Sequence, residues 1–211
     1  MLAQAAPKMV VDVLDAETDN PNGMIMSLFS HPQQFDSRYM NILFALDKLT
    51  FYSESAERTC RILFRLYQVD QDKFRYSNSP YSSLLNALCF TNTYFPFPIS
   101  KKVELLLDFW QEDSYHGAKL NIGILNKKVM FLPSQYGRIG QYHETELYYA
   151  EYYHAIEQIA EASLRYFISV SDIESIIAVF ENYVNYRPQF LMDLAHLLEG
   201  NSFDAASPAK L

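Results

Sequence analysis

The chain has 211 residues, of which 49% are hydrophobic, 20% are charged and only 6 are glycine, and its formal net charge is -8. The apolar fraction is sufficient for the core of one or two globular domains, whereas scarce glycine argues against a turn-rich β architecture and against glycine-rich ligand loops. The lysines and arginines are scattered through an acidic chain, so no nucleic-acid partner is expected.

The N-terminal residues lack the marks of an export signal. They begin with no basic segment, and Lys8, Asp12 and Asp15 interrupt the apolar residues. Nowhere does the chain approach the roughly 18 consecutive apolar residues of a membrane-spanning helix. Cys60 and Cys89 lie in apolar contexts, as buried thiols do in a reducing compartment. We therefore expect a cytoplasmic protein with no membrane association.

The first expected helix covers residues 4–16, where Val10, Val13 and Leu14 form an apolar stripe. A polar turn at 19–23 then leads into a short apolar segment at 24–29.

Residues 36–70 carry the strongest helical pattern and should form the centre around which the chain folds. Both halves repeat apolar residues at steps of three and four. The first set is Tyr39, Ile42, Leu43, Leu46 and Leu49, and the second is Ala56, Cys60, Leu63, Phe64 and Tyr67. Ser53 is a suitable N-cap for the second helix. The link between them is short, so the two helices should form an antiparallel pair.

Three more helices are expected in the middle of the chain. The first, at 82–90, is almost wholly apolar and should be buried. An aromatic loop with two prolines follows, and Ser100 caps the next helix. The apolar face of that helix is Val103, Leu106, Leu107 and Trp110. A weaker helix is expected at 114–125, because two glycines interrupt it.

Residues 126–142 break the pattern and are expected to form a short strand or an irregular insert. Helix resumes over 144–167. Ser171 and Glu174 then have the spacing of a capping box. The apolar repeat that follows the box is Ile173, Ile176, Ile177, Phe180 and Val184.

A last amphipathic helix is expected from Arg187-Pro188 to Gly200. Its apolar residues are Leu191, Leu194, Ala195 and Leu198. Residues 201–211 are small and polar, so we expect a disordered tail. Paired helices thus recur, which predicts an all-α fold: an irregular α-solenoid or an array of antiparallel helical hairpins. We expect one domain over 1–200, with 126–142 as the place for any boundary inside it.

No motif for chemistry stands out. Neither close glycine pair, Gly117/Gly123 or Gly137/Gly140, precedes the Lys-Ser or Lys-Thr of a phosphate-binding loop. The histidines lack metal-ligand spacing, and neither cysteine has a partner two or three residues away. These histidines are His31, His116, His143, His154 and His196. We expect no cofactor, no metal and no catalytic residue.

Basic residues form two doublets, Lys101-Lys102 and Lys127-Lys128, and one helical stripe. The stripe is Arg58, Arg61 and Arg65, at spacings of three and four. A solvated helix face is the favoured interpretation, with a phosphate site as the alternative.

The least ordinary feature is a cluster of tyrosines at the start of the long helix. Tyrosine is enriched at protein interfaces because its ring buries area while its hydroxyl stays hydrogen-bonded. Simple packing of the long helix inside a helical layer is the favoured interpretation, and a docking face is the alternative. The residues proposed for a docking face are Tyr142, Tyr148, Tyr149 and Tyr152, with Tyr153 beside them.

The run from Phe35 to Leu125 resembles the helical region of STAND-type NTPases, large multidomain bacterial signalling proteins of the antiphage-defence kind. A helix of the form ALDKL is followed by one containing RILFRL. Further matching features are the turn Asn78-Ser79-Pro80, the pair Ser83-Leu84, the loop at Phe95-Pro96, the helix Val103 to Trp110, and the aromatic-rich entry and long helix from Tyr148 to Phe180. The similarity covers residues 3–199.

This resemblance implies a sensor or scaffold array that normally lies beside an NTPase or effector module. No such module is present here, so the chain is either a segment of a larger protein or a free-standing relative. The leading hypothesis is a non-catalytic module that binds another protein. The alternatives are a small enzyme with a site gathered from distant residues, such as His143, Glu146 and Cys89, and a structural oligomer subunit.

Overall fold

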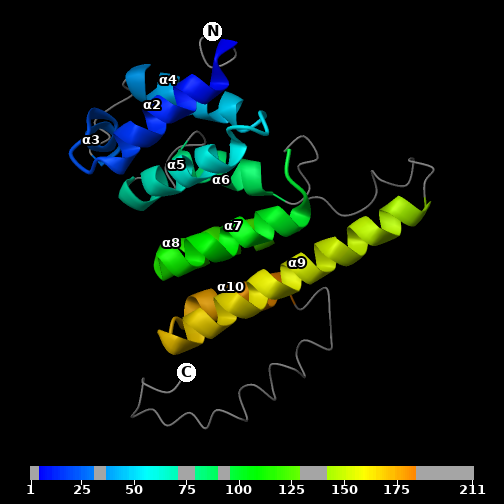
Figure 1. Cartoon of the computed structure of the whole chain (residues 1–211). Coiled ribbons are helices and arrows are strands. Elements are labelled where there is room, and N and C mark those ends of the chain that lie inside the picture. Colours follow the sequence, from blue (N-terminus) through cyan, green and yellow to red (C-terminus); the bar gives the residue numbers. More distant parts are fainter. Residues whose placement is uncertain (1–4, 31–36, 71–78, 90–95, 129–141, 184–211) are drawn as a thin grey trace. The chain divides into compact units, whose positions relative to one another are not determined.

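A computed structural model describes residues 5–30, 37–70, 79–89, 96–128 and 142–183 (Figure 1). Within these ranges the side chains of 126–128, 142–153, 180, 182 and 183 are not described. The described residues form nine α-helices and no strand, which confirms the all-α prediction. None of these helices combines the length and the apolar character that crossing a bilayer requires.

The chain forms two compact units, residues 1–109 and 110–211. Their boundary lies within α7 (Ile99–Glu112). The expected single domain over 1–200 stays a prediction. Residues 126–128 and 142, at the two ends of the expected irregular insert, are helical, so the prediction was wrong there. Residues 129–141, the centre of that insert, and residues 201–211, the expected tail, lie outside the described residues.

The first unit is organised around α5 (Ala56–Val69), the second helix of the pair that the sequence places at the centre of the whole chain. This helix contacts α2 (Pro7–Asp19), α3 (Met24–Ser30), α4 (Ser37–Leu49) and α6 (Pro80–Leu88). Its buried residues therefore occupy more than one face: Ala56, Thr59, Cys60, Ile62, Leu63, Phe64, Leu66 and Tyr67. In addition, Phe64 stacks on Phe109 of α7, with ring centroids 4.4 Å apart.

α4 lies against α5 with the face that the sequence predicts. Leu43, Leu46 and Leu49 are buried. The connection to α5 is held by Ser55, whose Oγ donates hydrogen bonds to the backbone oxygens of Leu49 at 2.8 Å and Tyr52 at 3.2 Å. α5 begins directly after Ser55. The prediction of Ser53 as the N-cap was therefore wrong.

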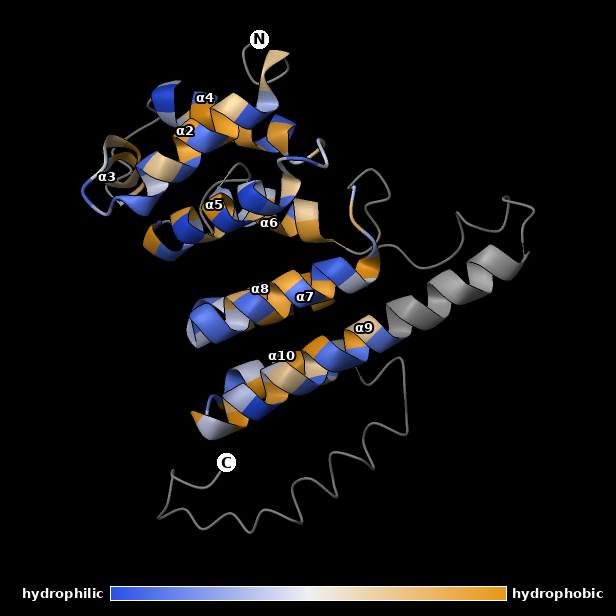
Figure 2. Cartoon of the chain, in the orientation of Figure 1, coloured by the Kyte–Doolittle hydropathy of each residue, from blue (hydrophilic) through white to orange (hydrophobic). Residues whose placement is uncertain are grey.

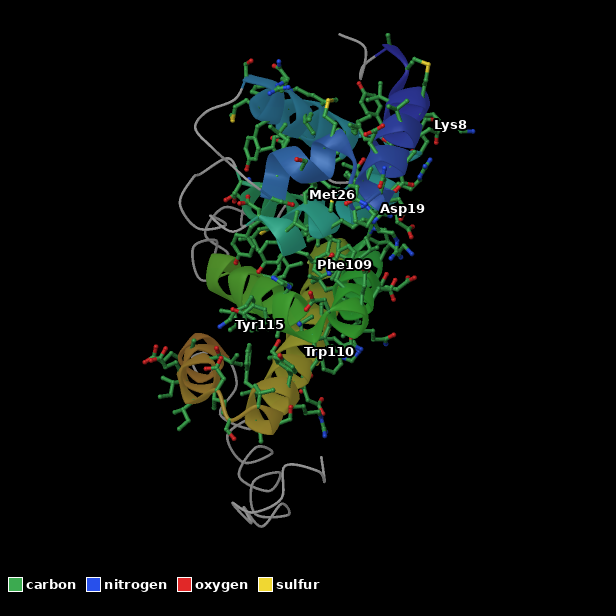
Figure 3. All side chains as sticks on the ribbon, turned by 90° about the vertical axis from the view of Figure 1, so that its left-hand side faces the viewer. Lys8, Asp19, Met26, Phe109, Trp110 and Tyr115 are labelled. Atoms are coloured by element: carbon green, nitrogen blue, oxygen red, sulfur yellow. The ribbon has the colours of Figure 1, made fainter. Side chains whose placement is uncertain are left out.

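α2 turns a different face toward the core from the one expected. Val11, Leu14 and Thr18 are buried, whereas Val13 is 58% exposed. Thr18 can be buried because its Oγ1 donates a hydrogen bond to the backbone oxygen of Leu14 at 2.8 Å. Lys8 and Asp19 mark the two ends of this helix in Figure 3.

The turn between α2 and α3 requires glycine, in keeping with the polar turn predicted at 19–23. The Gly23 amide donates a hydrogen bond to the Asn20 backbone oxygen at 2.8 Å. A Cβ at residue 23 would lie 2.5 Å from the Glu17 backbone oxygen and 2.9 Å from that of Asn20. Any side chain here would therefore push the two helices apart.

α6 and α7 begin one or two residues earlier than the sequence suggests. Ser79 caps α6 by accepting a hydrogen bond from the Ser82 amide at 3.2 Å. α7 begins at Ile99, one residue before the predicted cap Ser100, and the Pro98 backbone oxygen accepts the amides of Lys101 and Lys102. Leu84, Leu85, Ala87 and Leu88 of α6 are buried, as its apolar sequence predicts.

The second unit is built from α8 (Ser114–Lys128), α9 (Tyr142–Ser169) and α10 (Ile173–Tyr183), and each of the three contacts the other two. Apolar and polar residues alternate around the described parts of these helices (Figure 2). The buried apolar residues of α9 are Ala155, Ile156, Ile159, Ala160, Leu164, Phe167 and Ile168. Asn121 of α8 is fully buried, and neither atom of its side-chain amide has a hydrogen-bond partner.

A left-handed residue makes the corner between α9 and α10. Ser171 has a φ of 56°, and the amide of Asp172 donates to the Phe167 backbone oxygen at 2.9 Å. Ser171 therefore ends α9. The cap of α10 is Asp172, whose carboxylate accepts the Ser175 amide at 3.1 Å and the Ser175 hydroxyl at 2.7 Å. The predicted capping box of Ser171 with Glu174 was wrong, because its first residue belongs to the preceding helix.

Candidate binding surfaces

The three arginines of α5 bind acidic side chains of neighbouring helices. Asp15 of α2 accepts hydrogen bonds from Arg58 Nε at 3.0 Å, Arg58 Nη2 at 2.8 Å and Arg65 Nη1 at 2.9 Å. Arg58 also pairs with Asp12. Arg61 pairs with Asp108 of α7 at 2.9 Å. The stripe is thus neither a bare solvated face nor an open phosphate site: its charges tie α2 and α7 to α5.

Asp15 is the centre of this ion-pair network. Its partial burial would raise the pKa of its carboxyl group, but the hydrogen bonds from Arg58 and Arg65 outweigh that effect, and the pKa lies below its usual value of 3.8. The folded state therefore gains stability from Asp15 above pH 4, and this gain is lost as the pH falls through the lowered pKa.

We expect Asp15→Asn to lower the free energy of unfolding at pH 7 by about 1–2 kcal/mol, since hydrogen bonds to charged groups contribute about 1.5–3 kcal/mol and partial exposure weakens them. Urea unfolding at pH 7 and at pH 2 measures the effect. The difference from wild type should be smaller at pH 2, because protonation of Asp15 as the pH falls through its lowered pKa weakens its ion pairs. Asp19→Asn is the matched control, because the Asp19 side chain is 82% exposed and lies 3.9 Å from Arg65. Equal losses in both variants would contradict the role of Asp15.

A buried lysine lies at the junction of α6 and α7. Lys102 is 2% exposed, and its Nζ donates a hydrogen bond to the Cys89 backbone oxygen at 2.9 Å. That oxygen follows the last turn of α6, where a positive charge is favourable. Even so, burial lowers the pKa of Lys102 from its usual 10.5 to about 8. In the sequence Lys102 is one half of an ordinary basic doublet, whereas in the structure it is part of the core.

Cys60, on α5, is unreactive as a nucleophile. Cys60 is fully buried, and burial raises the pKa of its thiol to about 12, so the thiol is protonated at neutral pH. Cys89 is also buried, at the C-terminal end of α6 rather than in the middle of a helix. The side chains of His143 and Glu146 lie outside those described, so the alternative enzyme site stays a prediction.

The described histidines lie where helix caps and surfaces place them. His116 Nδ1 is 2.6 Å from Asp113 Oδ2, and its amide donates to Asp113 Oδ1 at 3.1 Å. Asp113 thus precedes α8 as its N-cap. His154 is exposed on α9. In the part of the chain that the structure describes, no group of three or more His, Cys, Asp or Glu residues could hold a metal ion.

The tyrosines proposed as a docking face lie within α9. Its backbone is helical from Tyr142, so Tyr142, Tyr148, Tyr149 and Tyr152 share one helix. Their side chains lie outside those described. The docking face at these residues stays a prediction.

Two exposed phenylalanines lie on α4 and just after it, outside the residues that the sequence singles out. Phe44 is 59% exposed and Phe51 is 53% exposed. α4 ends at Leu49, and Phe51 lies in the turn that follows, where its amide donates a hydrogen bond to the Lys48 backbone oxygen at 3.3 Å. We call Phe44 and Phe51 the aromatic pair. The sequence indicates that the aromatic pair is exposed, because neither ring belongs to the apolar stripe of Leu43, Leu46 and Leu49.

A second group of exposed apolar residues lies at the corner of α9 and α10. Val170, Ile173 and Ile177 are 51%, 67% and 50% exposed. We call these three residues the aliphatic edge. The sequence predicts Ile173 and Ile177 as core residues of their helix, yet no described helix covers them.

Comparison of the chain with family models, curated proteins and solved structures gave no match.

Proposed function

We propose that the chain is a non-catalytic helical module that binds another protein through the aromatic pair Phe44 and Phe51. The observation that carries the proposal is the exposure of both rings, one on α4 and the other two residues after its end, beside a core that is already filled by Leu43, Leu46 and Leu49. Large aromatic side chains are the commonest anchors of protein interfaces, and exposing them without a partner is unfavourable.

The spacing of the pair defines the partner that would fit. Phe51 lies two residues beyond the end of α4, and a span of seven residues that is mostly helical separates the two positions by about 10 Å. The complementary surface is an apolar groove or two apolar pockets with that separation. Asn41 and Lys48 are exposed on the same face and would supply a polar rim. Because the chain carries a net charge of -8, basic residues around that groove would favour association.

The chemistry of the described ionisable groups supports a binding role rather than catalysis. The arginines of α5 are paired with carboxylates, and the Cys60 thiol is buried with a raised pKa. Groups that are neutralised or buried in this way hold helices together and do not present an acid, a base or a nucleophile to a substrate.

The resemblance to STAND-type NTPases extends the proposal to a biological setting. A sensor or scaffold region of a bacterial defence or signalling system would use such a helical surface to recognise a second protein. The arrangement of neighbouring genes tests this part: an adjoining NTPase or nuclease gene supports the defence setting, and an unrelated metabolic operon contradicts it. Tyr142, Tyr148, Tyr149 and Tyr152 remain the second surface that we propose for contact.

Quantitative capture from lysate of the source cells tests the binding surface. Wild type, Phe44→Ser/Phe51→Ser and the control Met9→Ser/Val13→Ser are immobilised at equal density, and captured proteins are compared by mass spectrometry. Met9 and Val13 are 53% and 58% exposed on α2, so the control removes matched apolar area elsewhere. We expect one or more proteins to bind wild type and the control and to fall at least tenfold with the α4 variant.

Circular dichroism and urea unfolding show whether the variants are folded, and both should remain within about 0.5 kcal/mol of wild type, as exposed sites usually do. An equal fall in capture by both variants would mean that proteins bind nonspecifically to exposed apolar residues, and would contradict the proposal. Undiminished capture by Phe44→Ser/Phe51→Ser would mean that the interface does not include the aromatic pair.

A further inference from the structure

The aliphatic edge lies on α10 and at the corner before it, and no helix in the described part of the chain covers it. Hydrophobic periodicity assigns Ile173 and Ile177 to the core side of this helix, but both are at least half exposed. Val170, at the corner before the helix, is half exposed as well. Two large aliphatic residues one turn apart on α10, with a third at the adjoining corner, are an interface pattern rather than scattered surface apolarity.

α10 is already anchored by its opposite side. Ser175 and Val179, four residues apart, are buried where α10 contacts α8 and α9. Lys119 of α8 fixes this contact, because its Nζ donates to Ser175 Oγ at 3.0 Å and lies 5.6 Å from the centre of the Phe167 ring. The second unit therefore cannot cover the aliphatic edge by rotating α10 without giving up the contact that it already makes.

The chain supplies an occupant of suitable pattern directly after α10. α10 ends at Tyr183, and 28 residues follow, since the chain has 211 residues and 211 minus 183 is 28. Arg187-Pro188 is a helix start in sequence terms, with apolar residues at the spacing of one helical face. Those residues are Leu191, Leu194, Ala195 and Leu198.

Length and register fit an antiparallel helical hairpin. A helix from 187 to 199 is about 20 Å long and α10 is about 17 Å, at 1.5 Å per residue. Folding the chain back at 184–186 sets Ile177 opposite Leu194 and Ile173 opposite Leu198. We propose that residues 187–199 dock antiparallel on the aliphatic edge and complete the second unit.

The occupant is this segment rather than a second copy of the chain because the link is only three residues long. A short link holds the segment at an effective concentration in the millimolar range or above, which a separate molecule does not reach in dilute solution. Short connections between helices also favour antiparallel packing of the two helices that they join.

Disulfide cross-linking tests the register. We would prepare Ile177→Cys/Leu194→Cys as the matched pair and Ile177→Cys/His196→Cys as the control, in which the second cysteine lies on the opposite face of the expected helix. Cys60 and Cys89 are buried and are kept. After mild oxidation at micromolar protein, peptide mapping should find the matched pair joined within one chain at least tenfold faster than the control pair.

Hydrogen exchange is the second measurement, and it does not depend on introduced cysteines. Amides of 187–199 should exchange at least tenfold more slowly in the full chain than in Ile173→Ser/Ile177→Ser, while α8 keeps its protection in both proteins. Cross-links between two chains would assign the aliphatic edge to a second copy and overturn the proposal. Equal cross-linking of matched and control pairs, or unprotected amides over 187–199 in the wild type, would overturn it as well.

Discussion

Leu43→Ala should lower the free energy of unfolding by about 2–5 kcal/mol, the usual range for truncating a buried leucine. Leu43 is 2% exposed on the side of α4 that packs on α5. Removing its branched end leaves a cavity that the surrounding leucines cannot fill without moving the two helices. The next residue, Phe44, is 59% exposed, so Phe44→Ala should change stability by less than about 0.5 kcal/mol.

Urea unfolding followed by circular dichroism measures both variants of this neighbouring pair. The contrast between them is the informative result, because the two positions share the same helix and the same turn. A loss below about 0.5 kcal/mol for Leu43→Ala, or a larger loss for Phe44→Ala, would mean that α4 turns the opposite face to the core.

Lys102→Met should alter how stability depends on pH above neutrality. The pKa of Lys102 is about 8 when folded and 10.5 in the unfolded chain, so between these values the unfolded state binds more protons and the lysine makes stability rise with pH. A difference of 2.5 units, from 10.5 to about 8, corresponds to roughly 3 kcal/mol at about 1.4 kcal/mol per unit. Wild type should therefore gain about 3 kcal/mol relative to Lys102→Met between pH 7 and pH 11.

The comparison with the variant reduces the contribution of other titrations to this measurement. Burial raises the pKa of Cys60 and of Tyr81 to about 12, and both groups make stability fall with rising pH above their usual values of 9.0 and 10.0. Burial alone shifts the pKa of Tyr81, so its contribution cancels in the difference. The Lys102 charge lowers the pKa of Cys60, so the contribution of Cys60 cancels only in part. Urea midpoints at pH 7, 8, 9.5 and 11 give the curve. A constant difference across this range would contradict the shifted pKa of Lys102.

Helix positions were largely predictable because hydrophobic periodicity is a local property of the chain. The central role of α5 followed from a sequence that is apolar around more than half of the helix. The buried face of α2 was not predictable in the same way. Thr18 lies in that face because its hydroxyl is satisfied by the Leu14 backbone oxygen, and a hydrophobicity pattern does not register a polar residue whose hydrogen bond is internal.

Helix caps were harder to predict because the sequence offers several candidates within a few residues. Ser53 and Ser55 could both begin α5, and Ser171 and Asp172 could both begin α10. The choice depends on where the preceding helix ends, and in the second case on the left-handed φ of Ser171. Such a backbone angle is set by the packing of α10 on α8 and α9 rather than by the identity of one serine.

The roles of the charged residues depended on distant partners. Asp15 meets Arg65 across 50 positions of sequence, and Lys102 meets the Cys89 oxygen across 13. The aromatic pair could have been suspected, since both rings lie off the apolar stripe, but exposure is a property of the whole unit. Chain pattern therefore predicts which segments are helical, and tertiary packing decides which polar groups are buried and which apolar ones are not.

The contacts of α5 with α2, α3, α4 and α6 limit how the first unit can be divided. A fragment that starts after α4 would lack α2, α3 and α4, and so would expose the residues of α5 that pack on them. A fragment that stops before α6 would expose the residues of α5 that pack on α6. Neither half of the first unit can therefore be removed to make a smaller version of it. The turn at Gly23 that joins α2 to α3 is equally unsuited to shortening, because the Gly23 amide and the Asn20 backbone oxygen hold it closed.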